Sequence, residues 1–81
     1  MSENEKDLCT KLANMIRGRR NYLGLTLEEV GVKAGVARNT VWAIEKNSYG
    51  VRLNLVLKVI TALDLNVLAY SADGTFNQVV L

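Results

Sequence analysis

Residues 24–45 have the sequence GLTLEEVGVKAGVARNTVWAIE, which predicts two short helices joined by a tight turn. Thr26 and Glu29 have the spacing of a capping box, so the first helix should begin there. Gly35 should end it, because glycine readily adopts the left-handed conformation that a sharp turn between helices needs. The second helix should then run from about Ala37 to Lys46. This stretch therefore predicts a helix-turn-helix unit.

The outward face of the second helix carries the side chains with the most informative chemistry. Its apolar spacing turns Val41 and Ile44 inward. Arginine can form two hydrogen bonds with guanine, asparagine can do the same with adenine, and alanine can contact a thymine methyl group. Because an α-helix fits the DNA major groove, we expect the outward-facing residues to read bases. These candidates are Arg38, Asn39, Trp42 and Ala43.

The role of Trp42 is open to three interpretations. An exposed indole on this helix could pack against the sugar-phosphate wall of the groove or donate its N–H group to a phosphate. It could also anchor a protein partner, since tryptophan is common at the centre of protein interfaces. The second class of function for this chain is therefore a protein-interaction module.

The distribution of charge favours a polyanion as partner. Residues 11–58 contain nine Lys or Arg and three Glu, for a net charge of +6, whereas the segments before and after each carry −2. Such a localised basic region is typical of nucleic-acid-binding proteins. The polar and basic residues expected to flank the groove and contact phosphates are Arg17, Thr26, Thr40, Lys46, Asn47, Ser48, Tyr49 and Arg52.

The composition argues against an enzyme, a metal protein and a membrane protein. Cys9 is the only cysteine and the chain has no histidine, which removes the usual general base and the usual metal ligands. We therefore expect no catalytic residues, no metal and no cofactor. Apolar runs fall well short of the roughly 20 residues that cross a bilayer. No secretory signal opens the chain, so we expect a soluble intracellular protein without a membrane partner.

Two further helices should surround the central pair. One is expected over residues 6–23, closed by Gly24, and the other over residues 53–63. Arg19 interrupts the apolar stripe of the first, and its guanidinium group should reach solvent. The apolar residues that define the two stripes are Leu8, Leu12, Met15, Ile16 and Leu23 in the first helix, and Leu53, Val56, Leu57, Ile60 and Leu63 in the second.

After Asp64 the pattern changes from helical to alternating, which predicts one or two β-strands with a turn at Asp73–Gly74. The second strand should cover residues 75–81. Because an isolated hairpin is barely stable, we expect a homodimer joined through these strands. The alternatives are a hairpin folded back on its own helices and a partly disordered tail. The expected dimer contacts are Leu65, Val67, Ala69, Phe76 and Val79. We divide the chain into a helical domain over residues 1–63 and a dimerisation segment over residues 64–81.

The pattern Gly-Leu-Thr…Ala-Gly-Val…Thr-Val…Ile-Glu in residues 24–45 resembles the lambda-repressor-like, or XRE-type, helix-turn-helix family. This resemblance implies a mainly α fold, a compact domain of four to five helices, here followed by a C-terminal strand or hairpin. It also implies an interior ion pair between Arg20 and Glu45. Leu27 departs from the family pattern, because a glutamine that bonds a phosphate is common there. Gly31 replaces the usual alanine, at some cost in helix propensity.

The segment from Leu53 to Val67 is similar to HipB-type antitoxins, in which a fourth helix leads into a strand that pairs with the dimer mate. The resemblances together imply a cytoplasmic, nucleoid-associated regulator of a bacterium or phage. It would bind double-stranded DNA as a homodimer, repress transcription at a palindromic operator, and in the antitoxin case also bind a cognate toxin protein.

Overall fold

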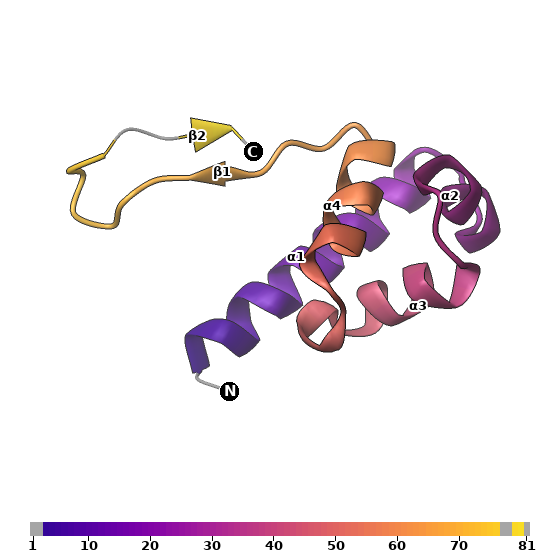
Figure 1. Cartoon of the computed structure of the whole chain (residues 1–81), viewed down its shortest axis with the longest axis horizontal. Helices are drawn as coiled ribbons and strands as arrows, with labels where there is room; N and C mark the ends of the chain where they lie inside the picture. The colour runs from indigo at the N-terminus through magenta and orange to yellow at the C-terminus, as the bar shows by residue number, and fades with distance from the viewer. Residues whose placement is uncertain (1–2, 77–78, 81) are drawn as a thin grey trace.

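The computed structural model describes residues 3–76 and 79–80, and within them the chain is mainly helical. The helices are α1 (Glu3–Tyr22), α2 (Leu27–Ala34), α3 (Arg38–Lys46) and α4 (Leu53–Ala62), with a 3-10 helix η1 (Ser48–Gly50) before α4. A hairpin of β1 (Leu68–Ala69) and β2 (Val79–Val80) follows (Figure 1). The expected mainly α fold with a C-terminal hairpin is confirmed. Among the described helices, none is long and apolar enough to cross a membrane.

The α2–turn–α3 unit forms through the local interactions that the sequence predicts. The Thr26 backbone N–H donates to Glu29 Oε1 at 2.9 Å, and the Glu29 N–H donates to Thr26 Oγ1 at 3.1 Å, which completes the capping box. Gly35 ends α2 with a φ of 72°, in the left-handed region. Ala37 precedes α3 without a capping side chain, so α3 depends on packing for its position.

Gly31 lies where α2 comes close to the backbone of the turn that follows it. A Cβ atom at this position would lie 2.8 Å from the Val36 carbonyl oxygen and 3.4 Å from the Arg38 nitrogen. Both atoms belong to the backbone, which cannot move aside as a flexible side chain can. The glycine therefore permits the close approach, and its cost in helix propensity is the lesser effect.

The core lies where the four helices meet. It consists of the buried residues Ile16, Val30, Val41, Ile44, Val56, Val59, Ile60 and Leu63. Three residues of the predicted apolar stripes, Leu8, Met15 and Leu53, lie outside this core with side chains that are 65%, 59% and 69% exposed. Leu23 and Leu57 are also exposed. The N-terminal half of α1, which carries Leu8, extends beyond the other helices (Figure 1).

Arg19 has a structural role that its place in the helical pattern does not reveal. Its Nε donates to the Leu63 carbonyl oxygen at 3.0 Å, while its guanidinium carbon lies 5.5 Å from the centre of the Tyr22 ring. The guanidinium group, which the sequence predicts to reach solvent, therefore also donates a hydrogen bond to a carbonyl oxygen at the C-terminal end of α4. Asp64 follows with a φ of 56°, which turns the chain out of the helix.

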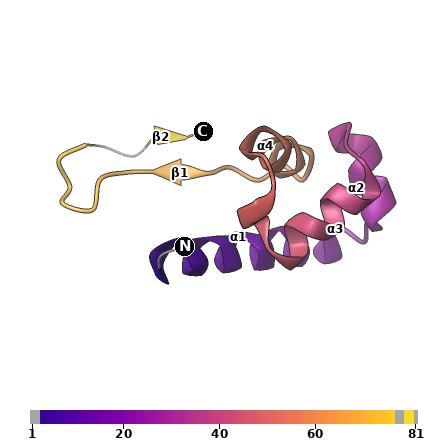
Figure 2. The same ribbon diagram turned by 60° about the horizontal axis from the view of Figure 1, so that its bottom comes forward.

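The hairpin projects away from the helical body, in the same direction as the N-terminal half of α1 (Figures 1 and 2). β1 and β2 are antiparallel, with Leu68 opposite Val80 and Ala69 opposite Val79. The strands are shorter than expected, and Thr75 and Phe76 belong to the connecting loop instead of the second strand. Residues 77, 78 and 81 of that expected strand lie outside the described residues.

Candidate nucleic-acid interface

The exposed face of α3 presents a row of large side chains. Arg38, Trp42 and Lys46 are each separated by four residues, which places them on one side of the helix. Asn39 is exposed beside Arg38, and Trp42 is 49% exposed. The side chains of Arg38 and Asn39 form no hydrogen bond or ion pair within residues 3–76 and 79–80. The first turn of α3 is therefore available to an external partner.

Not every candidate base-reading residue is equally accessible. Ala43 is only partly exposed, as is Thr40, one of the phosphate candidates, because both lie toward the helical body. A methyl group at position 43 can still touch a ligand that approaches α3 closely. Most of the accessible surface at the candidate base-reading positions therefore belongs to Arg38, Asn39 and Trp42.

A groove of about 360 Å³ opens beside this row, where the last turns of α1 and the first turn of α2 meet α3. Its lining residues are Arg17, Arg20, Leu27, Trp42, Glu45 and Lys46. Three cations and one carboxylate give this lining a net charge of +2. Leu27 contributes an apolar wall at the position where the family pattern commonly has a phosphate-binding glutamine.

An ion pair between Arg20 and Glu45 closes the inner side of the groove. Arg20 Nε donates to Glu45 Oε2 at 2.6 Å and Nη2 donates to Oε1 at 2.9 Å, with side-chain exposures of 16% for Arg20 and 7% for Glu45. Hydrogen bonding to Glu45 raises the pKa of Arg20 against the opposing effect of burial. Arg20 Nη1 also donates to the Leu25 carbonyl oxygen at 2.9 Å. This charge is therefore used inside the fold and adds little to the exposed surface.

The other two cations of the groove are held by neighbours on their own helices. Lys46 Nζ lies 4.8 Å from the centre of the Trp42 ring, within the range of a cation–π interaction. Arg17 Nη2 donates to Asn14 Oδ1 one turn earlier on α1. Asn14 was not a candidate in the sequence, although the three-residue spacing between them is a recognisable signal for such a contact.

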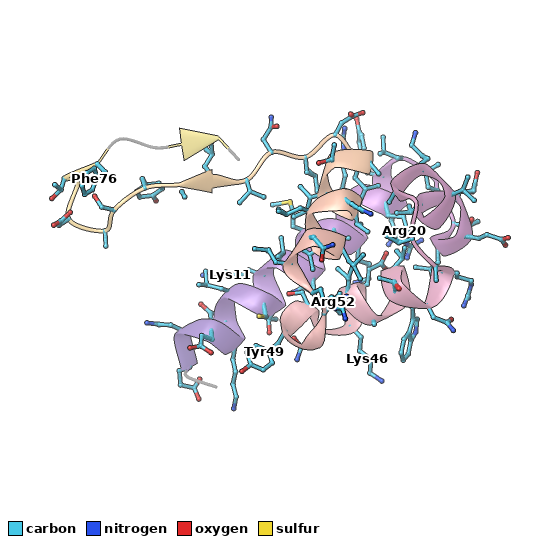
Figure 3. The ribbon with its side chains drawn as sticks, viewed as in Figure 1. Lys11, Arg20, Lys46, Tyr49, Arg52 and Phe76 are labelled. Atoms are coloured by element: carbon cyan, nitrogen blue, oxygen red, sulfur yellow. The ribbon has the colours of Figure 1, made fainter. Side chains whose placement is uncertain are left out.

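The remaining phosphate candidates lie in three different environments. Ser48 is buried with 7% exposure, so it is the least accessible of the predicted phosphate contacts. The Thr26 hydroxyl accepts the Glu29 N–H, and Asn47 Oδ1 accepts the Tyr49 N–H at 3.0 Å, so both oxygens have local partners. Tyr49 and Arg52 are exposed. Lys46 and Tyr49 extend from the same side of the molecule, whereas Arg20 lies among the helices (Figure 3).

The candidate dimer contacts also lie in different environments, some packed against the core and others exposed. Leu65 and Val67 pack in part against the core of their own chain. Ala69 and Phe76 are exposed, the latter by 73%, and so are Leu68 and Tyr70 beside them. The side chain of Val79 falls outside the described part of the chain. The exposed apolar surface of the hairpin therefore lies farther from the helices than expected.

Comparison with known proteins identifies the family. No family model matches the chain. It is 40% identical over 52 residues to an uncharacterized HTH-type transcriptional regulator of Methanothermobacter thermautotrophicus, a match that covers 64% of this chain and 75% of the relative. HipB in its O4 20mer complex is 28% identical with a TM-score of 0.72, covering 78% of this chain and 89% of HipB.

The restriction-modification controller protein C.Esp1396I, solved as a point mutant, has the same fold. Its TM-score is 0.66 at 24% identity, over 72% of this chain and 75% of the controller protein. The curated relative matches this chain over 75% of its own length. The chain belongs to the XRE-type, or lambda-repressor-like, family of helix-turn-helix transcriptional regulators.

Proposed function

We propose that this protein is a sequence-specific DNA-binding repressor that binds a palindromic operator as a homodimer. The observation that carries the proposal is the first turn of α3, where Arg38 and Asn39 are exposed and have no partner among the described residues. Binding of α3 in the major groove would occlude a promoter without any catalytic step. The family supports DNA as the partner, and the protein would act in the cytoplasm at the nucleoid.

Within this proposal, Arg38 and Asn39 read base edges and Ala43 contacts a thymine methyl group. The phosphate contacts come from exposed residues around α3, namely Arg17, Lys46, Tyr49 and Arg52. Thr40 and Asn47 remain candidates at the edge of this surface. The Thr26 oxygen accepts a hydrogen bond in the capping box, and its O–H group can still donate to a phosphate at the start of α2.

The hairpin is the proposed dimerisation segment, which divides the chain into residues 1–63 for DNA and residues 64–81 for dimer formation. A two-stranded sheet has open edges that another chain can extend. Its exposed Leu68, Tyr70 and Phe76 would be covered by the second copy. Such a dimer would place its two α3 helices about 34 Å apart, one turn of DNA.

The similarity to HipB favours an antitoxin as a narrower version of the same function. In that case the protein would repress its own operator and also bind a cognate toxin. Co-purification with the product of a neighbouring gene would support this version, and a lone gene would restrict the protein to stand-alone regulation.

Affinity for a selected operator and for scrambled DNA, measured across a range of salt concentrations, tests the proposal. Arg38→Ala should relax specificity at one base position, whereas Lys46→Ala should weaken binding to all sequences alike and reduce the slope of log K against log salt by about 1. Equal affinity of the parent chain for a selected operator and for scrambled DNA would contradict sequence-specific reading. No duplex binding at low salt would instead favour the protein-interaction module, with half-exposed Trp42 as its anchor.

A further inference from the structure

The groove between α1, α2 and α3 contains two cations that are already held in place. Arg17 is bonded to Asn14, and Lys46 Nζ lies 4.8 Å from the centre of the Trp42 ring. The third cation of the lining, Arg20, is neutralised by Glu45. Arg17 and Lys46 therefore supply the uncompensated positive charge of the groove.

The walls of the groove determine what kind of anion it fits. Leu27 and the Trp42 ring are apolar, and Leu27 offers no side-chain donor. A free inorganic anion would gain nothing from these walls. A DNA backbone unit combines one phosphate with an apolar sugar face, which matches two cations beside two apolar side chains.

We propose that this groove clamps one DNA phosphodiester between Arg17 and Lys46, and that Trp42 is a positioning residue that holds Lys46 and packs against the adjoining deoxyribose. The proposal rests on the proposed DNA binding and assigns Trp42 to the backbone instead of the bases. A free lysine side chain loses much rotamer freedom when it binds a phosphate. Lys46 has lost part of that freedom in advance, because tryptophan is the most favourable aromatic partner for an ammonium group.

The position of Trp42 supports the backbone role over base reading. Its indole ring interacts with Lys46 and also lines the groove beside Leu27, and about half of its surface is covered. Because the Trp42 ring contacts Lys46 and lines the groove beside Leu27, it lies along the wall of the groove. Arg38 and Asn39, which have no such contacts within the described residues, remain the residues that read bases.

A double-mutant cycle on Trp42 and Lys46 tests the clamp. The full chain and its Trp42→Leu, Lys46→Gln and doubly substituted variants would be titrated with a scrambled duplex of about 30 base pairs, roughly three turns, across a range of salt concentrations. Lys46→Gln should reduce the salt slope by about 1 and weaken binding about fivefold. Trp42→Leu should produce a loss at least as large, because it also removes the contact with the deoxyribose, and the double variant should lose little more than Trp42→Leu alone.

Two controls separate the clamp from a general loss of structure. Trp42→Phe retains an aromatic face and should restore most of the affinity. Tyr22→Leu is a matched control, because Tyr22 is also an exposed ring beside a cation, Arg19, but does not line the groove. It should leave the affinity and the salt slope unchanged. Thermal melts of all variants would establish that each is folded.

A measurement on the free protein tests the positioning step without DNA. The ε-methylene protons of Lys46 should show a ring-current shift in the NMR spectrum, and Trp42→Leu should abolish it. Additive losses in the double-mutant cycle would overturn the positioning role. A change in preference between selected and scrambled duplexes in Trp42→Leu would also overturn it, because Trp42 would then read bases. Failure of the parent chain to bind any duplex at low salt would overturn the proposed function and the clamp together.

Discussion

Replacing Arg20 by methionine should destabilise the protein more than any surface substitution. Arg20 donates two hydrogen bonds to Glu45, at 2.6 and 2.9 Å, and one to the Leu25 carbonyl oxygen at 2.9 Å. Because the Glu45 side chain is only 7% exposed, Arg20→Met would leave a buried carboxylate without its countercharge. The change also removes the bond that ties the C-terminal end of α1 to the start of the next segment.

The expected loss follows from the burial of the pair. Removing one partner of a buried ion pair costs about 3–5 kcal/mol. An 81-residue chain has a total stability of about 4–12 kcal/mol. The melting temperature should therefore fall by at least about 12 °C, since each kcal/mol shifts a domain of this size by about 4 °C or more. Urea and thermal unfolding followed by circular dichroism would measure both quantities.

The matched double variant Arg20→Met/Glu45→Leu separates loss of the pair from exposure of a lone charge. With both charges gone and apolar side chains in their place, most of the lost stability should return. A loss below about 1 kcal/mol in Arg20→Met would show that the pair is effectively solvated. A double variant no more stable than the single one would refute the argument from the stranded carboxylate.

Three other substitutions test separate parts of the structure. Gly31→Ala should lower the free energy of unfolding in urea titrations, because its Cβ would lie 2.8 Å from the Val36 carbonyl oxygen. This holds although alanine favours helices by about 1 kcal/mol over glycine. A more stable variant would contradict this contact. Hydrogen bonds from the Thr26 backbone and side chain hold the pKa of Glu29 below its usual value of 4.5, so its contribution is present above that pH and lost as the pH falls through the lowered value. Glu29→Gln should therefore be less stable at neutral pH and lose stability less steeply in acid than the parent, and parallel pH profiles would exclude this contribution. Leu68→Lys should shift the proposed dimer toward monomer in sedimentation, whereas Asn66→Lys, at an exposed polar residue, should not; an unchanged mass for Leu68→Lys would remove the hairpin from the interface.

Features that depend on neighbouring residues in the chain could be predicted from the sequence. The capping box of Thr26 and the left-handed Gly35 are local, so the bounds of α2 and the turn before α3 agree with expectation. The Arg20–Glu45 contact spans 25 residues, and only the family resemblance implied it.

Features that depend on distant packing could not be predicted in this way. Leu8 and Met15 have helical apolar spacing but are 65% and 59% exposed, although Ala13 and Ile16 on the same helix are buried. Ser48 is a polar loop residue by sequence and is buried in the structure. The spacing of Trp42 and Lys46 is visible in the sequence, whereas Arg17 and Leu27 join them only through the packing of α1 and α2 against α3.

Selection of bound sites from a pool of random duplex DNA, with the purified full chain, tests the central claim most directly. The account predicts that a palindrome is recovered, with half-sites centred about 10 base pairs apart, one for each α3 of a dimer. Arg38→Ala should then recover the same palindrome with one position of each half-site relaxed. Recovery of no enriched sequence by the parent chain would contradict the claim that this protein reads DNA through α3.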